Sequence, residues 1–392
     1  MRDRALLLLV SAALAWMFQV HLRVSHVDYN TFHEAGARVL GGDLANLYSH
    51  RPSSMGGFLY PLGAAWFFTG FEVLGEWPGR LAFYLLLAAC LIGILRWTSR
   101  EFPAGPHSSR ALWITLLLGS RSINDSWISG NVSLLLLALA ILSFHFYARS
   151  RTRLDLHLSA ACFGLAASLK LFPLAAGAFW AWRRDLRHLL RFTCWTAGLY
   201  IAPYLLLGAW DGTFERSAHL LGQWFSVLRD PANFGSNEMI HFQNLTTALH
   251  RLASSLELGR GWITPLVGLL ALLFTLIPAL RRRHANSPAQ DTFDFAVVLA
   301  WVPLFSPVTW HHVGVFYLPL IHATAAETVR EGRLRRSLPL WSFFILYTLT
   351  GKNVLGTGLH ASISQHSIPL LGVLALVLPA TRRSFRRASA PA

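Results

Sequence analysis

The residues best suited to chemistry are ionisable side chains that interrupt a largely apolar chain. The first is Asp28, a few residues past the first predicted membrane span at about residues 5–20. A short amphipathic helix is expected over about 29–40, because Phe32 and Ala35 recur on one side at helical spacing. A carboxylate held at the membrane surface by such a helix suits a substrate with a polar head group and a lipid tail. The alternative is that Asp28 only caps this helix.

Lys170 is the second candidate, since it interrupts the apolar run 157–182 together with Pro173. A buried lysine needs a counter-charge, and a phosphate group would supply one. We expect two short helices that form a hairpin with Lys170 at the turn, because broken helices in membranes occur where they line a polar cavity. The alternatives are one continuous kinked span and a lysine that reaches outward to the interface.

Further polar residues are predicted to lie on the external side of the membrane or just below it. His311 and His312 could donate hydrogen bonds to a phosphate, bind a metal or line the interface. Two adjacent histidines without further ligands are a weak metal signal, and no metal site is predicted. A short external loop is expected over residues 121–131, from Arg121 to Asn131, after the third predicted span. Asp125 in this loop could be a second acid or a cap on the following helix. The residues expected to bind the substrate are Asp125, His33, Tyr60, Asn131, His241, Asn244, Trp310 and Lys352.

The composition indicates an integral membrane protein. Of the 392 residues, 54% are hydrophobic and 14% charged, an apolar excess that the polar surface of a soluble protein cannot cover. The formal charge of +15 would suit nucleic-acid binding. The basic residues, however, form short clusters between apolar runs, as in cytoplasmic loops, so nucleic acid is excluded as a partner. The three cysteines lie inside apolar runs and predict no disulfide framework.

The basic clusters predict about twelve membrane-spanning helices with both termini in the cytoplasm. We expect a single transmembrane domain over 1–392, with a first external loop at 21–77 that carries amphipathic juxtamembrane helices. A second long external region is expected at 210–261, and a basic cytoplasmic tail at 381–392. Residues 58–75 are expected to lie in the outer leaflet, because a crossing there would place the next basic cluster outside.

Six sequence motifs resemble, in order, those of glycosyltransferase family 87. They are Asp28-x-x-x-Phe32-x-x-x-Gly36 with Leu40-Gly-Gly-Asp43 and Tyr48, Phe58-x-Tyr60-Pro61, Gly130-Asn-Val-Ser133, Gly164-Leu-Ala-Ala-Ser-Leu-Lys170-Leu-Phe-Pro173, Gln243-Asn-Leu245 with Arg251-Leu252, and Leu304-Phe-Ser-Pro-Val-Thr-Trp-His-His312. The resemblance covers about residues 20–325. The chain has Tyr60-Pro61-Leu62 where the family usually has Tyr-Pro-Pro, Gly130-Asn131-Val132-Ser133 for Gly-Gln-x-Asn, and Thr309-Trp310-His311-His312 for Ser-Trp-Asp-His-His.

The resemblance implies the GT-C fold, which is all-α and polytopic, in a bacterial plasma membrane with the active site on the external side. It implies an inverting sugar transfer from a polyprenyl-phosphate sugar, mannose by first choice and arabinofuranose or another hexose otherwise. The acceptor would be a glycolipid or a cell-envelope glycan. Asp28 would be the general base, while Lys170, His311 and His312 would bind the donor phosphate. No metal or other cofactor is implied.

Two other classes of function fit part of the pattern. A carrier or flippase for a lipid-linked sugar would also use a basic pocket and amphipathic helices. It would not need a carboxylate in the first external loop, and it would usually show paired halves in the sequence, which are not evident. A non-catalytic assembly partner in the cell envelope is the third possibility. The linkage and the oligomeric state are left open by the residues.

Overall fold

The computed structural model describes six ranges of the chain: 27–48, 58–212, 214–229, 243–281, 287–306 and 311–389. Its α-helices are α2 (Val27–Leu40), α3 (Leu62–Glu72), α4 (Glu76–Glu101), α5 (Ser108–Ser129), α6 (Ser133–Ala148), α7 (Arg153–Leu169), α8 (Ala178–Trp182), α9 (Leu186–Asp211), α10 (Glu215–Arg229), α11 (Leu245–Ser255), α12 (Ile263–Arg281), α13 (Pro288–Phe305), α14 (Leu318–Arg330), α15 (Leu338–Phe343), α16 (Lys352–Gln365) and α17 (Ile368–Ser389). Shorter turns are η1 (Leu44–Asn46), η2 (Gly105–His107), η3 (Phe172–Gly177), η5 (His311–Tyr317), η6 (Leu334–Arg336) and the π-helical η7 (Phe344–Thr348). The predicted all-α class is confirmed for these residues.

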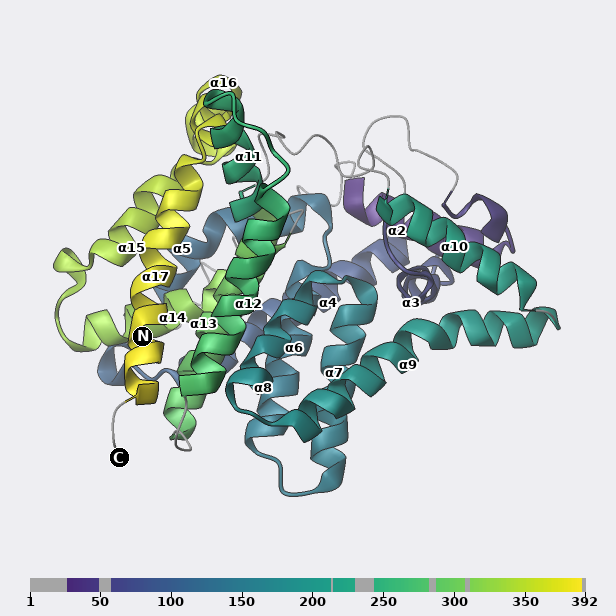
Figure 1. Ribbon diagram of the computed structural model, residues 1–392, viewed down its shortest axis with the longest axis horizontal. Coiled ribbons are helices and arrows are strands. Elements are labelled where there is room, and N and C mark those ends of the chain that lie inside the picture. The colour runs from purple at the N-terminus through teal and green to yellow at the C-terminus, as the bar shows by residue number, and fades with distance from the viewer. Residues whose placement is uncertain are drawn as a thin grey trace.

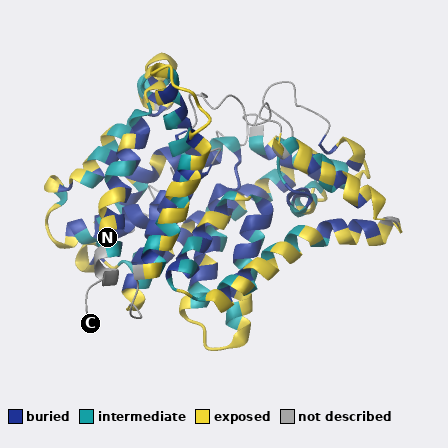
Figure 2. Cartoon of the chain, viewed as in Figure 1, coloured by how far each residue is buried: buried dark blue, intermediate teal, exposed yellow. Residues whose placement is uncertain are grey.

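Four of these helices are long and apolar enough to cross a membrane: α4, α9, α12 and α17. A fifth span results if the pair α5 and α6, bent by 117° at their junction, is counted as one. The outer sides of α9 and α12 carry exposed leucines, among them Leu205 and Leu272, which suits contact with lipid (Figure 2). These features establish membrane-protein character. The count of about twelve spans stays a prediction.

The helices lie side by side in a broad bundle (Figure 1). In this view α2, α3 and α10 lie at the right above α9, while α6, α7 and α8 form the middle and α12 to α17 the left side. Helix α6 packs against α7, α7 packs against α9, and α5 packs against both η5 and α14. Segments far apart in the sequence therefore meet at α5.

Helix α2 is the amphipathic helix predicted after Asp28. An acid in its first turn and Arg38 in its last turn complement the helix dipole, and Gly42, at φ +72°, ends the helical run. The buried Phe32 ring stacks on Phe68 of α3, with 4.5 Å between ring centroids. A Cβ atom at Gly36 would lie only 2.9 Å from the Phe68 carbonyl carbon, so the two backbones pack closely. Helix α3 has 11 residues and is not among the candidate spans. The expected position of residues 58–75 in the outer leaflet stays a prediction.

The corner between α5 and α6 is more helical than the sequence suggested. The sequence predicts a short external loop over residues 121–131, but α5 continues through Ser129, because Ser122 and Ser126 are buried in the protein interior instead of facing water. Gly130 ends the helix in the left-handed conformation, at φ +63°. A Cβ atom there would lie 2.6 Å from Cβ of Tyr29. The start of α2 therefore rests directly on this corner.

The chain leaves the helix at Lys170, where the sequence predicts a break. Helix α7 begins with a capping box, in which Thr152 and Asp155 satisfy each other's backbone amides, and it ends at Leu169. Lys170 is extended, with φ −158° and ψ 135°. Pro173 in the following turn cannot donate to a helical ladder. The run 157–182 therefore folds as a helix, a break and short turns, not as one continuous span.

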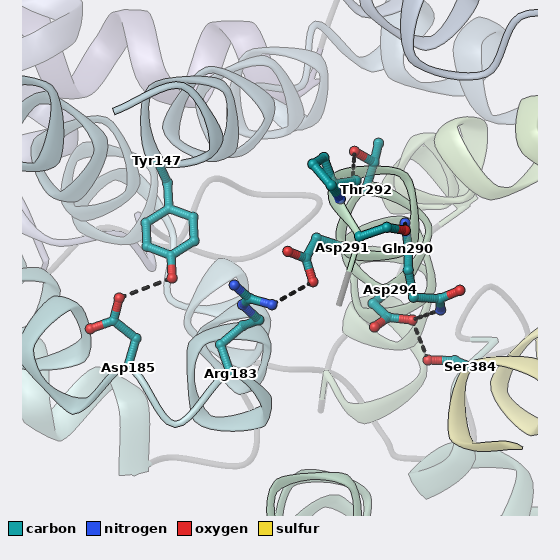
Figure 3. Close-up of polar contacts among 10 residues, drawn as sticks. Tyr147, Arg183, Asp185, Gln290, Asp291, Thr292, Asp294 and Ser384 are labelled. Carbon is teal, nitrogen blue, oxygen red and sulfur yellow. Dashed lines mark hydrogen bonds and ion pairs between the residues drawn. The ribbon is translucent and has the colours of Figure 1, made fainter. Parts of the chain in front are cut away.

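A polar network joins the helices at the end of α6 that lies farther from the α5–α6 corner. At 1.5 Å per residue, about 21 Å of helix separates Ser133 from Tyr147. The Tyr147 hydroxyl donates to Oδ2 of Asp185 at 2.9 Å, and Arg183 pairs with Asp291 at 2.8 Å (Figure 3). These bonds tie α6 and the α8–α9 connection to the start of α13.

A second group of polar contacts, also on α13, surrounds Asp294, which is fully buried. Its Oδ1 atom accepts hydrogen bonds from Gln290 at 2.6 Å and from the Ser384 hydroxyl at 2.5 Å (Figure 3). Helix α17 is thereby tied to α13. The donors supplied by the protein explain how this carboxylate is accommodated away from water.

The close approach at Gly130 yields a stability prediction. Replacing Gly130 with alanine would place a Cβ in the left-handed region and against Tyr29, at a cost of about 1–3 kcal/mol. We expect a lower midpoint of thermal unfolding for detergent-solubilised Gly130→Ala, measured by intrinsic fluorescence. Gly93→Ala is the matched control, since Gly93 lies in α4 with open space around it. Equal midpoints for the two variants would contradict the tight corner.

Candidate active site

Asp28 lies in the first turn of α2 and is half-buried. Its Oδ2 atom accepts a hydrogen bond from the Asn131 side-chain amide at 2.8 Å. The carboxylate therefore reaches across to the α5–α6 corner in addition to lying at the start of its own helix. A purely local capping role does not account for this contact.

Asn131 is fully buried and its side-chain amide has a determined orientation. Its Oδ1 atom accepts from the backbone N–H of Ser133 at 2.9 Å and from the Ser133 hydroxyl at 2.6 Å. A backbone N–H can only donate, so the atom facing it must be the amide oxygen. The amide N–H₂ group then faces Asp28. This arrangement favours the ionised form of the carboxylate, which can accept but not donate.

The charges around Asp28 act in opposite directions. Burial raises the pKa of Asp28 above its ordinary value, while the positive charge of Lys170 and hydrogen bonds from Asn131 and Ser129 lower it. Burial also lowers the pKa of Lys170 to about 8, against the opposing effect of the Asp28 charge. Both residues lie outside the candidate membrane spans. Lys170 thus remains cationic at neutral pH, and it favours the carboxylate form of Asp28.

Aromatic rings and a neutral histidine surround Lys170. Its Nζ atom lies 5.2 Å from the centroid of the Tyr60 ring and 5.5 Å from that of Phe172, at cation–π distance. His312 is buried, and burial followed by the Lys170 charge holds its pKa well below the usual range. The imidazole is therefore neutral, able to donate a hydrogen bond without adding a charge. Asp28, Tyr60, Lys170 and His312 form the candidate active site.

His311 belongs to a neighbouring group of polar side chains. Its Nε2 atom lies 2.8 Å from a guanidinium nitrogen of Arg121, which is buried. Asp125 and Lys352 interact electrostatically with each other, and Asp125 also does so with Arg121. Asp125 does not cap α6, whose N-cap position is occupied by Val132. The two predicted substrate-binding residues Asp125 and Lys352 are thus brought together on the Arg121 side.

Two other predicted residues make contacts that stabilise the fold. His33 pairs with Glu72 at 2.7 Å and so links α2 to α3. Asn244 caps α11 by accepting from the backbone N–H of Thr247 at 2.7 Å. The last two predicted residues, His241 and Trp310, lie outside the described residues. Among the described residues, no group of three histidine, cysteine or acidic side chains could hold a metal ion.

Arg121 is the functional candidate that sequence reasoning missed. Arg121 follows the apolar run 111–120, and the sequence pattern predicts that it lies in an external loop, where an arginine is common. The structure instead buries it within α5, with 7% of its surface exposed. One feature of the sequence could have identified Arg121: it lies one helical turn before Asp125, so the two side chains would share a face of a helix.

These observations define a helical membrane protein in which a carboxylate, a lysine and a neutral histidine meet beside a helix corner. Buried ionisable groups with shifted pKa values are costly, and together they often mark a functional site. Comparison with known proteins identifies the family. The model for glycosyltransferase family 87 matches residues 58–307, more than half of the chain, so the chain belongs to that family.

Two relatives come from Mycolicibacterium smegmatis. The polyprenol-phosphate-mannose-dependent alpha-(1-2)-phosphatidylinositol mannoside mannosyltransferase is 30% identical over 177 residues, which are 43% of this chain and 37% of that protein. The polyprenol-phosphate-mannose-dependent alpha-(1-2)-phosphatidylinositol pentamannoside mannosyltransferase is 28% identical over 331 residues, 81% of this chain and 74% of that protein. The match thus spans little more than a third of the first relative and about three quarters of the second.

Among solved structures, ArnT from Cupriavidus metallidurans is similar to this chain. The structure bound to undecaprenyl phosphate has a TM-score of 0.40 and 15% identity, covering 96% of this chain and 78% of ArnT. The apo structure has a TM-score of 0.42 and 17% identity, covering 99% and 78%.

Proposed function

We propose that the chain transfers mannose from a polyprenyl-phosphate-linked donor to a lipid-linked or cell-envelope glycan acceptor on the external face of the plasma membrane, with inversion at the sugar carbon. The observation that carries the proposal is the Asp28 carboxylate, held by Asn131 and facing the charge of Lys170. Family membership and the donor named for both mycobacterial relatives support the class of reaction and the choice of donor.

In the proposed reaction, the acceptor hydroxyl oxygen attacks the anomeric carbon of the donor sugar. Its proton passes to the Asp28 carboxylate, and the bond from the anomeric carbon to the phosphate oxygen breaks. The electron pair of that bond leaves with the lipid phosphate. Lys170 balances the growing charge on the phosphate, and the neutral His312 donates a hydrogen bond to it. A positioned general base of this kind contributes about 10²–10⁴-fold to the rate.

The remaining side chains hold these groups. Asn131 holds the Asp28 carboxylate in place through Oδ2. Tyr60 packs its ring against Lys170 and keeps the lysine at the site. Asp125 and Lys352, which interact with each other near Arg121, are placed to bind the polar part of a substrate. The exposed apolar surface of the spans suits the lipid tails of donor and acceptor.

Removing the base tests the proposal. Asp28→Asn in nanodiscs should lose about 10²–10⁴-fold in transfer of labelled mannose from polyprenyl-phosphate mannose to a membrane extract, while the donor still binds. Asp43→Asn, an exposed carboxylate that bonds Asn46 beyond the end of α2, is the control and should retain activity. Full activity in Asp28→Asn would exclude the base. Movement of the lipid-linked sugar across vesicles without transfer would identify a carrier instead.

The pH dependence of transfer follows from the two shifted groups. The reaction needs Asp28 ionised and Lys170 protonated, so kcat/KM should fall below the raised pKa of Asp28 and again above a pH of about 8. Lys170→Arg keeps its charge to far higher pH, and its alkaline fall should disappear. An alkaline limb that stays near the same pH in Lys170→Arg would assign it to another group.

Asn131 should control the acid limb of the same profile. Asn131→Ala removes a donor to the carboxylate, so the pKa of Asp28 rises further and the acid limb moves to higher pH. Ser133→Ala is the matched variant, because the backbone N–H of Ser133 still orients the amide, and it should shift the limb less. An unmoved limb in Asn131→Ala would show that the hydrogen bond does not tune Asp28.

A further inference from the structure

Arg121 joins two segments that border the candidate active site. One guanidinium nitrogen, Nη1, donates to the Tyr347 carbonyl at 2.6 Å and to the Thr350 hydroxyl at 3.0 Å. The other, Nη2, lies 2.8 Å from Nε2 of His311. The guanidinium carbon lies 5.1 Å from the centroid of the Tyr347 ring. One buried side chain therefore binds both η5 and the turn between η7 and α16.

The chemistry of this contact determines the state of His311. A guanidinium group carries donors only, so Nε2 of His311 must accept the hydrogen bond. The imidazole is then neutral and carries its proton on Nδ1. A second proton on Nε2 would break the bond and place a cation against a cation. His311 therefore acts here as a hydrogen-bond acceptor, and its Nε2 atom is not available to a phosphate.

The position of His311 also determines where its neighbour points. In a 3-10 helix of 3.0 residues per turn, consecutive side chains diverge by about 120°. When His311 turns toward Arg121, His312 turns to another side, where it interacts with the charge of Lys170. The two adjacent histidines thus have different partners.

Close packing makes this orientation rigid. Gly314 lies against Tyr347 and Ser122, because a Cβ atom there would come within 2.1 Å of the Tyr347 hydroxyl and 2.3 Å of Oγ of Ser122. Those two hydroxyl groups are themselves hydrogen-bonded at 2.7 Å. The ring of His360, from α16, lies with its centroid 5.7 Å from that of His311. Helix α5, η7 and α16 therefore enclose the start of η5.

We propose that Arg121 is a positioning residue for the donor site: it holds His311 as a neutral acceptor and thereby places His312 beside Lys170. The inference rests on the proposed function for its kinetic consequence. The state of His311 itself depends only on the contact with Arg121. Arg121 acts through His311 and touches no reacting atom.

Substitutions at both ends of the contact test this role. Arg121→Met and His311→Leu each remove the hydrogen bond and should raise KM for polyprenyl-phosphate mannose by about 10- to 100-fold. His311→Gln presents a carbonyl oxygen near the position of Nε2, cannot gain a proton, and should restore near-native KM. The double variant Arg121→Met, His311→Leu should lose no more than either single variant.

Two results would overturn the proposal. If His311→Gln is as impaired as His311→Leu, His311 supplies a proton or a charge instead of accepting a bond. If the losses in the double variant multiply, Arg121 and His311 act independently. Arg183→Met is the control for loss of a partly buried, paired arginine. Arg183 pairs with Asp291 at the far end of the fold, so this variant should leave KM unchanged.

A spectroscopic measurement separates failure of this inference from failure of the proposed function. In a two-bond ¹H–¹⁵N correlation spectrum of histidine-labelled protein, the signal that vanishes in His311→Gln should show the neutral form with its proton on Nδ1. It should change in Arg121→Met. A protonated ring or the other tautomer in the native protein would overturn the assignment, whether or not mannose is transferred.

Discussion

The hydrogen bond between Asp28 and Asn131 is the contact on which the rest of the site depends. It joins a residue at the start of the amphipathic helix α2 to the corner between α5 and α6, 103 positions later in the chain. It can form because Gly130 lets the corner approach α2 at a distance that any Cβ would prevent. This bond lowers the pKa of the carboxylate, against the rise that burial causes.

The other parts of the site are also positioned near this corner. Helix α5 ends there, and along its last turns it carries Arg121 toward η5 and Ser129 toward Asp28. The break after α7 brings Lys170 to the same region from a third direction. Asp28 and Lys170 are each placed at a helix end, from which a side chain can reach across to a neighbour.

Local patterns allowed the polar interruptions to be predicted from the sequence, but not their partners. Asp28 and Lys170 stand out because each breaks an apolar run, and the amphipathic period of residues 29–40 is visible without tertiary information. The contacts of Asn131 with Asp28 and of His311 with Arg121 depend on packing between residues 103 and 190 positions apart. Arg121 was assigned to a loop because small polar residues around it resemble a turn, whereas inside a bundle they line a helix face.

Helix α6 separates the candidate site from the polar network of Figure 3 by a fixed length of rigid backbone. With hydrogen-bonded anchors at both ends, the depth of the carboxylate relative to the far face cannot change without breaking one set of bonds. For the lipid-linked substrates that we propose, a carboxylate at a fixed distance from the far face would favour head groups that lie at one level. A change in membrane thickness would then alter which substrates reach the site.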